Sequence, residues 1–196
     1  MKKLLSIFLP LFLLFQSCKN ETDNKKTVKT TKKIDENAQP NDNLEKSVLK
    51  TNLFKNIPTK QFPIVDSTNF DNYEKFGISY NDILKKIKFE VKIENAENFR
   101  INYKIPFSEN FTTVSITYQI GDHELFTTLI TVNNENKIID TLEISYDEIA
   151  ESAFQKTSNI NRDKIIVTEW NWMSGEPETE SETYILQIDG KFKKIN

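Results

Sequence analysis

Apolar and polar residues alternate along much of the second half of the chain. A strand places every second side chain on the same face, so this period predicts half-buried β-strands. Ile, Val, Phe and Tyr, which favour strands, occupy many of the alternate positions. The clearest stretches are residues 87–93, 99–107, 114–120, 124–132 and 137–146.

The connections between these stretches are short and predict an up-and-down antiparallel meander. Gly121-Asp122 fits a two-residue type II′ turn, which would place Tyr118 beside Leu125. A turn through residues 133–136 would then place Leu125 beside Ile144. In this register one continuous apolar face runs across the strands.

The flanking regions complete the expected fold. Ile149 to Phe154 includes helical spacing, but we expect an irregular strand over residues 154–160. Two short helices should precede the first strand, one capped by Ser67 or Thr68 and one by Ser79. Further strands are predicted over residues 164–172, 181–188 and, after the turn Asp189-Gly190, 191–195.

The expected fold class is therefore mainly β, a β-rich α+β fold. It is an antiparallel up-and-down meander of about seven to eight strands, with one or two short N-terminal helices. The sheet would curve into a half-barrel or barrel, or fold over as a sandwich. The pattern does not choose between these closures.

The N-terminus has the three parts of a secretory signal peptide. Lys2 and Lys3 give a positive start, residues 4–15 are an apolar run, and Ser17 precedes Cys18. The apolar run is shorter than the roughly 20 residues that a membrane-spanning helix needs. We therefore expect residues 1–17 to be removed.

Phe15-Gln16-Ser17-Cys18 resembles a relaxed bacterial lipobox. The resemblance implies cleavage before Cys18 and acylation of its thiol, so that Cys18 is the lipidation site. Cys18 is the single cysteine of the chain, which leaves no disulfide framework. The start Cys18-Lys19-Asn20-Glu21, the pattern LITV…NKIIDTLEI and the segment YILQIDGKF are similar to envelope lipoproteins of Bacteroidota.

This resemblance implies a lipid-anchored protein of the bacterial cell envelope, at the outer membrane, facing the periplasm or the surface. It implies a membrane partner through the lipid, and no particular activity. Residues 18–49 contain no aromatic residue and few apolar ones, so we expect a disordered tether. Residues 50–196 hold every Tyr and Trp and are expected to form a single β-rich domain.

The charge balance argues against nucleic acid as a partner. The whole chain has 26 basic and 29 acidic residues, and the signal peptide carries two of the basic ones, Lys2 and Lys3. The mature chain is therefore more acidic than the precursor. Nucleic-acid binding relies on basic surfaces.

The residues that usually carry catalysis or metal binding are scarce. His123 is the single histidine, directly after the Gly121-Asp122 turn, and we expect a solvated turn residue. The four glycines form no phosphate-binding loop, and the Cys and His count excludes a usual zinc site. We predict no catalytic residue, no metal site and no cofactor.

Three weaker features remain. Trp170 and Trp172 share a strand face and are expected in the core, the alternative being a platform that stacks on a sugar or peptide. Glu176, Glu178, Glu180 and Glu182 alternate, which is typical of a charged edge that discourages aggregation, the alternative being a calcium site.

Asp66-Ser67-Thr68 resembles the short O-glycosylation sites of exported Bacteroidota proteins, with Ser67 as the acceptor, and Asp140-Thr141-Leu142 resembles them too.

Together these features favour a non-enzymatic, lipid-anchored binding module whose partner is an unidentified protein or glycan. Two other functions stay open. One is a hydrolase of envelope glycans that uses a pair of carboxylates, one with a raised pKa. The other is a structural component of the envelope.

Overall fold

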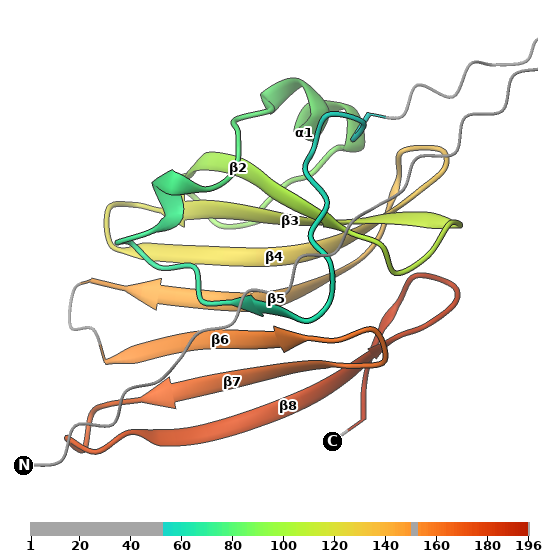
Figure 1. Cartoon of the computed structure of the whole chain (residues 1–196). Helices are drawn as coiled ribbons and strands as arrows, with labels where there is room; N and C mark the ends of the chain where they lie inside the picture. The colour runs from blue at the N-terminus through green and yellow to red at the C-terminus, as the bar shows by residue number, and fades with distance from the viewer. Residues whose placement is uncertain (1–52, 150–152, 196) are drawn as a thin grey trace, which may run out of the picture. The chain divides into compact units, whose positions relative to one another are not determined.

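The computed structural model describes residues 53–149 and 153–195. This part of the chain is mainly β, and its nine strands form one antiparallel sheet. The strands from β2 to β9 follow one another in the sheet in sequence order, as Figure 1 shows for β2 to β8. The predicted up-and-down meander is confirmed. The elements are β1 (Ile64–Asp66), a 3₁₀ turn (Tyr73–Lys75), α1 (Asn81–Ile87), β2 (Ala96–Ile105), β3 (Phe111–Ile120), β4 (Glu124–Asn133), β5 (Ile138–Glu148), β6 (Phe154–Ile160), β7 (Ile165–Asn171), β8 (Glu178–Leu186) and β9 (Phe192–Lys194).

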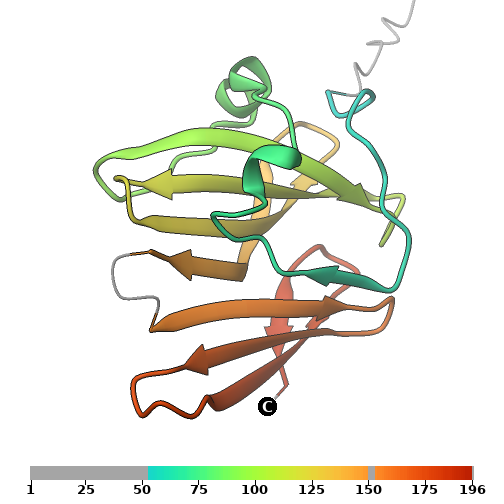
Figure 2. The ribbon, with the colours of Figure 1, turned by 60° about the vertical axis from the view of Figure 1, so that its left-hand side comes forward.

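The sheet is open, because among the described residues no ladder joins β2 to β9. The joint between β5 and β6 is narrow: only two residue pairs connect them, and the short strand β1 pairs with the other end of β6. The hairpin of β8 and β9 turns back toward β4 and β5 (Figure 2), and Thr131 Oγ1 on β4 donates to the Gly190 carbonyl at 2.6 Å. The sheet therefore curves strongly without closing.

Two apolar clusters hold the sheet together. One gathers around β2, β3, β4 and α1, and the other around β1 and the strands β4 to β7. Bulges in β2 divide its side chains between them, so that Ile101 joins the first cluster and Tyr103 the second. The first cluster has as its buried members Phe54, Ile57, Leu84, Ile87, Ile101, Val114, Ile116, Tyr118, Ile130 and Val132. The second has Ile64, Tyr103, Ile105, Leu129, Leu142, Ile144, Ile160, Ile165 and Val167.

The helix α1 is stabilised by the sheet and hardly by itself. It has seven residues, fewer than the roughly 12 that an isolated helix needs in water. Leu84 and Ile87 are buried against the sheet, which contributes about 2 kcal/mol for each side chain. The helix ends at Lys88, whose backbone is left-handed with φ of 55°.

Three expectations about the N-terminal part of the fold are wrong. Residues 87–93 do not form the first strand, since α1 runs to Ile87 and an irregular segment follows up to β2. Ser79 does not cap α1, because Tyr80 occupies the N-cap position and its side chain makes no capping hydrogen bond. The helix expected after Ser67 or Thr68 is reduced to the 3₁₀ turn, since Thr68 bonds Asp66 instead.

The predicted register is also wrong. The β3–β4 connection has three residues, from Gly121 to His123, so Tyr118 lies opposite Phe126 and Leu125 lies on the other face. Bulges between β4 and β5 add to this shift, and Leu125 faces Asp147 instead of Ile144. The strand expected over residues 154–160 is confirmed as β6.

The chain divides into two compact units, and all the described residues belong to the unit Ser47–Asn196. The predicted signal peptide, Cys18 and the tether of residues 18–49 lie outside the described residues, so they stay predictions. Within the described residues, no helix is long and apolar enough to cross a membrane.

Candidate functional site

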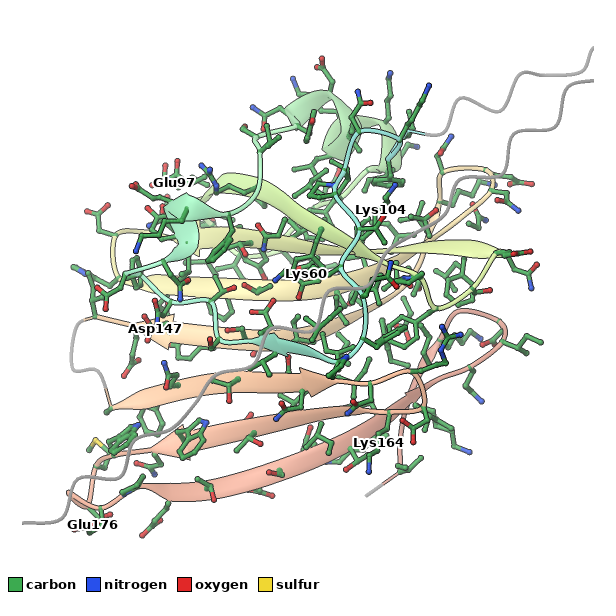
Figure 3. All side chains as sticks on the ribbon, in the orientation of Figure 1. Lys60, Glu97, Lys104, Asp147, Lys164 and Glu176 are labelled. Carbon is green, nitrogen blue, oxygen red and sulfur yellow. The ribbon has the colours of Figure 1, made fainter. Side chains whose placement is uncertain are left out.

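Acidic side chains gather at one end of the sheet. The meander brings the β3–β4 turn, the last residues of β5, the first residues of β6 and the β7–β8 turn to this end, which we call the acidic end. Figure 3 labels Asp147 and Glu176 there, and Lys164 at the opposite end, in the β6–β7 turn. A concentration of negative charge at one end attracts a positively charged partner to it.

A pocket of about 340 Å³ opens at the acidic end, across β4, β5, β6 and β7. Its wall combines aromatic rings with carboxylates and a single ammonium group. Its volume lies at the small end of the range for ligand sites. The lining residues are Glu124, Phe126, Glu143, Tyr146, Phe154, Gln155, Lys156, Glu169 and Trp170.

The hydroxyl of Tyr146 lies between two carboxylates of this site. It is 3.0 Å from Glu124 Oε1 and 2.9 Å from Glu148 Oε2. Burial raises the pKa of Tyr146 far above its ordinary value, and hydrogen bonds to Glu148 and Glu124 raise it further, so the phenol keeps its proton. One proton serves only one acceptor at a time.

Glu148 accepts more hydrogen bonds than Glu124. Its Oε1 accepts hydrogen bonds from the backbone N–H groups of Ala153 at 3.1 Å and Phe154 at 3.2 Å. Glu124 has Tyr146 as its hydrogen-bond donor and lines the pocket. The carboxylate of Glu124 is therefore the one with lone pairs left for a ligand.

Lys156 is the one basic residue among those that line the pocket. Its Nζ lies 2.5 Å from Glu143 Oε1 and 2.9 Å from Glu169 Oε1. Burial lowers the pKa of Lys156, but the hydrogen bonds that its ammonium donates to Glu143 and Glu169 outweigh burial, and the pKa lies above its ordinary value. The ammonium stays charged and fixes both carboxylates, while three lining carboxylates against one ammonium leave the pocket negative.

A second cavity of about 300 Å³ continues the first toward β8. It shares Phe154, Glu169 and Trp170 with the pocket and adds Asn171, Glu178, Thr179 and Glu180. Glu169 on β7 lies directly opposite Glu180 on β8. Like charges opposite one another destabilise a strand pair, so this position favours a nearby cation.

The two tryptophans lie at the same end of the sheet. Their indole rings are 6.3 Å apart and nearly parallel, at 14°. The expectation that both are core residues is wrong for Trp172, which is 43% exposed, and Trp170 is half-buried. Trp170 lies opposite Gln155, so its indole is on the other face from Lys156 and Glu169, where its Nε1 donates to Thr157 Oγ1 at 3.1 Å.

The other predicted positions fall outside the pocket. His123 is exposed in the β3–β4 turn, as expected. Ser67 is exposed beside β1, so the glycosylation hypothesis stays a prediction there. Glu176 lies in the β7–β8 turn and the other glutamates of the row lie on β8, and the described residues hold no group of three or more ligands suited to a metal ion.

Sequence reasoning found Trp170 but missed the rest of the pocket. Phe126, Glu143 and Lys156 come from three different strands, and only the true register brings them together. One signal was present in the sequence: Glu143, Lys156 and Glu169 are charged residues inside predicted strands. Charged groups within strands are expected to pair with one another across the sheet.

Comparison with family models, with curated proteins and with solved structures found no match. The function is therefore inferred from the geometry of the acidic end.

Proposed function

We propose that the protein is a non-enzymatic, lipid-anchored binding module of the bacterial cell envelope, and that the pocket at the acidic end binds a basic group of its ligand. The lipid anchor rests on the lipobox-like sequence at Cys18. The observation that carries the binding role is the Glu124 carboxylate, which lines the pocket and shares the single proton of Tyr146 with Glu148.

The pocket suits an ammonium or guanidinium group on an apolar stem. Glu124 offers a carboxylate oxygen to the charged head, and the rings of Phe126 and Phe154 offer apolar surface and π-faces. Such a head and stem occur together in Lys and Arg side chains. A protein or peptide partner with basic residues is therefore the ligand class that this wall supports best.

The hydrolase alternative gains less support from the same residues. A general acid needs a carboxyl group with a raised pKa facing a second carboxylate in the cleft. Asp147 has a raised pKa because of burial, but it does not line the pocket, and its Oδ2 accepts from the Phe70 N–H at 2.9 Å. Glu143 and Glu169 both form ion pairs with Lys156, so the ammonium group bridges these two carboxylates.

The experiment compares pentylamine with pentanoate, which have similar apolar stems and opposite charges. Isothermal titration calorimetry measures the affinity of each probe, since the indole of Trp170 lies on the other face of the sheet from Lys156. We expect pentylamine to bind and pentanoate not to bind. We expect Glu124→Gln to weaken pentylamine binding about tenfold, the effect of losing one charged hydrogen bond.

Glu124→Gln should keep the pocket intact, because Tyr146 can still donate to Glu148. The matched control is Glu135→Gln, which removes an exposed carboxylate paired with Lys137 in the β4–β5 connection, away from the acidic end. Equal binding of the two probes, or equal effects of the two substitutions, would contradict the proposal.

A second candidate ligand is a glycan on the face of Trp170 and Trp172. The exposed, nearly parallel indoles support it, because such rings stack on flat apolar surfaces. Trp172→Ala should then abolish retention of the protein on envelope glycans with little change in stability. Unchanged retention would remove this candidate.

A further inference from the structure

The outer edge of β8 lacks a neighbouring strand over its first half. β7 pairs with β8 along one side from Glu178 to Tyr184, whereas β9 pairs on the other side only with Tyr184, Ile185 and Leu186. One more bond extends this contact, from the Ile195 N–H to the Thr183 carbonyl at 2.9 Å. In the described part of the chain, no strand pairs with this side of β8 before Thr183.

The free backbone groups on this edge can be assigned by parity. Along a strand, the N–H and C=O groups of successive residues point alternately to opposite sides. The Thr183 carbonyl faces the β9 side, so the backbone groups of Thr179 and Ser181 face it as well. Both residues are exposed, and this edge can accept another strand.

The side chains beside these backbone groups, Glu178 and Glu180, are acidic and would attract a positively charged partner. Across β6, β7 and β8, Lys156, Glu169 and Glu180 lie directly opposite one another in a row. The row therefore runs positive, negative, negative. A basic side chain in a strand added beside β8 would neutralise Glu180 and relieve its repulsion with Glu169.

β9 shows how the edge is neutralised where a strand is present. Lys194 on β9 forms an ion pair with Glu182, and the same carboxylate accepts from the Tyr184 hydroxyl. The hydrogen bond from Lys194 is the main cause that lowers the pKa of Glu182. Glu178 and Glu180 continue this row of acidic residues on the part of the edge that β9 does not reach.

We propose that the edge of β8 from Glu178 to Ser181 is a strand-addition site for an extended peptide with Lys or Arg at alternate positions. This rests on the proposed function and specifies its partner. The peptide backbone pairs with Thr179 and Ser181, and its basic side chains lie over Glu178 and Glu180, toward the cavity of about 300 Å³ that these glutamates line.

The same charges disfavour a second copy of this chain as the occupant. Edge-to-edge pairing of two β8 strands would bring Glu178 and Glu180 of one copy against acidic residues of the other. Like charges across a strand pair are destabilising. The acidic row therefore repels a second copy and attracts a basic strand.

The test uses the purified full chain and the labelled peptide acetyl-Thr-Lys-Val-Lys-Thr-Lys-Val-Lys-amide, with a Glu-for-Lys peptide as the charge control. Fluorescence anisotropy measures affinity. The decisive variant is Thr179→Pro, which removes an outward N–H and leaves the charge unchanged, compared with Thr179→Ala, which keeps the N–H. Thermal unfolding checks that both variants fold.

We expect Thr179→Pro to weaken binding at least about tenfold relative to Thr179→Ala, and the Glu peptide not to bind. If the proline variant fails to fold, Glu178→Gln with Glu180→Gln replaces it, with the expectation of a similar loss that disappears at high salt. Equal affinities of the proline and alanine variants, or for the double glutamine variant and the original protein, would overturn the proposal.

The proposal for the edge and the proposal for the pocket can be refuted independently. If the edge proposal is wrong and the pocket binds, Glu124→Gln weakens peptide binding and Thr179→Pro does not. If the pocket is wrong and the edge binds, the pattern is reversed. Self-association in the absence of peptide that Thr179→Pro abolishes would show that a second copy occupies the edge, and would overturn the proposal.

Discussion

At the scale of single residues, the buried pair of Tyr103 and Asp66 fixes the N-terminal segment on the sheet. The Tyr103 hydroxyl donates to Asp66 Oδ2 at 2.5 Å, and the N–H and hydroxyl of Thr68 donate to Asp66 Oδ1. Both residues are about as buried as the apolar core. A buried carboxylate is tolerated only with such partners, so this pair stabilises one specific placement of β1.

This pair predicts a loss of stability in alkaline solution. Burial and the neighbouring Asp66 raise the pKa of Tyr103 well above its ordinary value near 10. The folded chain then holds a proton that the unfolded chain releases, so the stabilisation is complete below about pH 10 and is lost as pH rises above it. Each such tyrosine contributes a slope of about 1.4 kcal/mol per pH unit.

Urea unfolding at several values between about pH 9 and pH 11 measures this slope. Tyr103→Phe has no ionisable hydroxyl, so its free energy of unfolding should fall less steeply over the same range. Other titrating groups are common to both proteins and cancel in the comparison. Parallel curves for the two proteins would show that Tyr103 does not hold its proton in the folded state.

At the scale of elements, the hairpin of β8 and β9 packs its turn against β4 and β5. Gly190 has a φ of 86°, and its carbonyl accepts from Thr131. An added Cβ at this position would lie 2.7 Å from Ile139 Cδ1 and 3.3 Å from Phe111 Cδ1. Glycine is therefore needed here for both its conformation and its small size.

Gly175 offers a matched comparison, because it has the same φ of 86° and nothing within 4 Å of an added Cβ. Gly175→Ala should cost about 1 kcal/mol for the left-handed backbone alone. Gly190→Ala should cost about 1–3 kcal/mol more, since the methyl group also crowds Ile139. Urea unfolding measures both losses, and equal losses would mean that the hairpin does not pack as described.

The elements also show what the sequence can predict. Strands β2 to β9 were located because alternation and turn residues act locally, and those signals are present in the sequence. The segment 87–93 alternates as well, yet Phe89 and Val91 pack against the first cluster from an irregular segment. Alternation alone does not distinguish these two ways of burying every second residue.

The register was not predictable because it depends on bulges and on the length of one turn. β3 illustrates a second limit: Ser115 and Thr117 alternate with apolar residues in the predicted strand, yet they are buried, as is Thr113. Asn102 Nδ2 donates to Ser115 Oγ at 3.3 Å and to Thr117 Oγ1 at 2.7 Å, so the hydroxyls of Ser115 and Thr117 are satisfied inside the fold. The pocket depends on the same long-range pairing, so only Trp170 among its residues was named from the sequence.

At the scale of the whole molecule, the meander converts scattered charges into a directed surface. Glutamates that are far apart in the chain meet at the acidic end because each hairpin returns the chain to it. The resulting field attracts basic partners and weakens with salt. Pocket and β8 edge lie next to each other, so one basic peptide can use both.

The most direct test is an NMR titration of the ¹⁵N-labelled protein with the alternating Lys peptide. Binding at the acidic end predicts that the amide signals of Glu124, Tyr146, Lys156, Thr179 and Ser181 shift together and saturate. The Thr179 and Ser181 amides should also exchange more slowly with solvent, because the added strand would bond them. Shifts confined to other parts of the sheet, or identical shifts with the Glu peptide, would contradict a basic-ligand site at the acidic end.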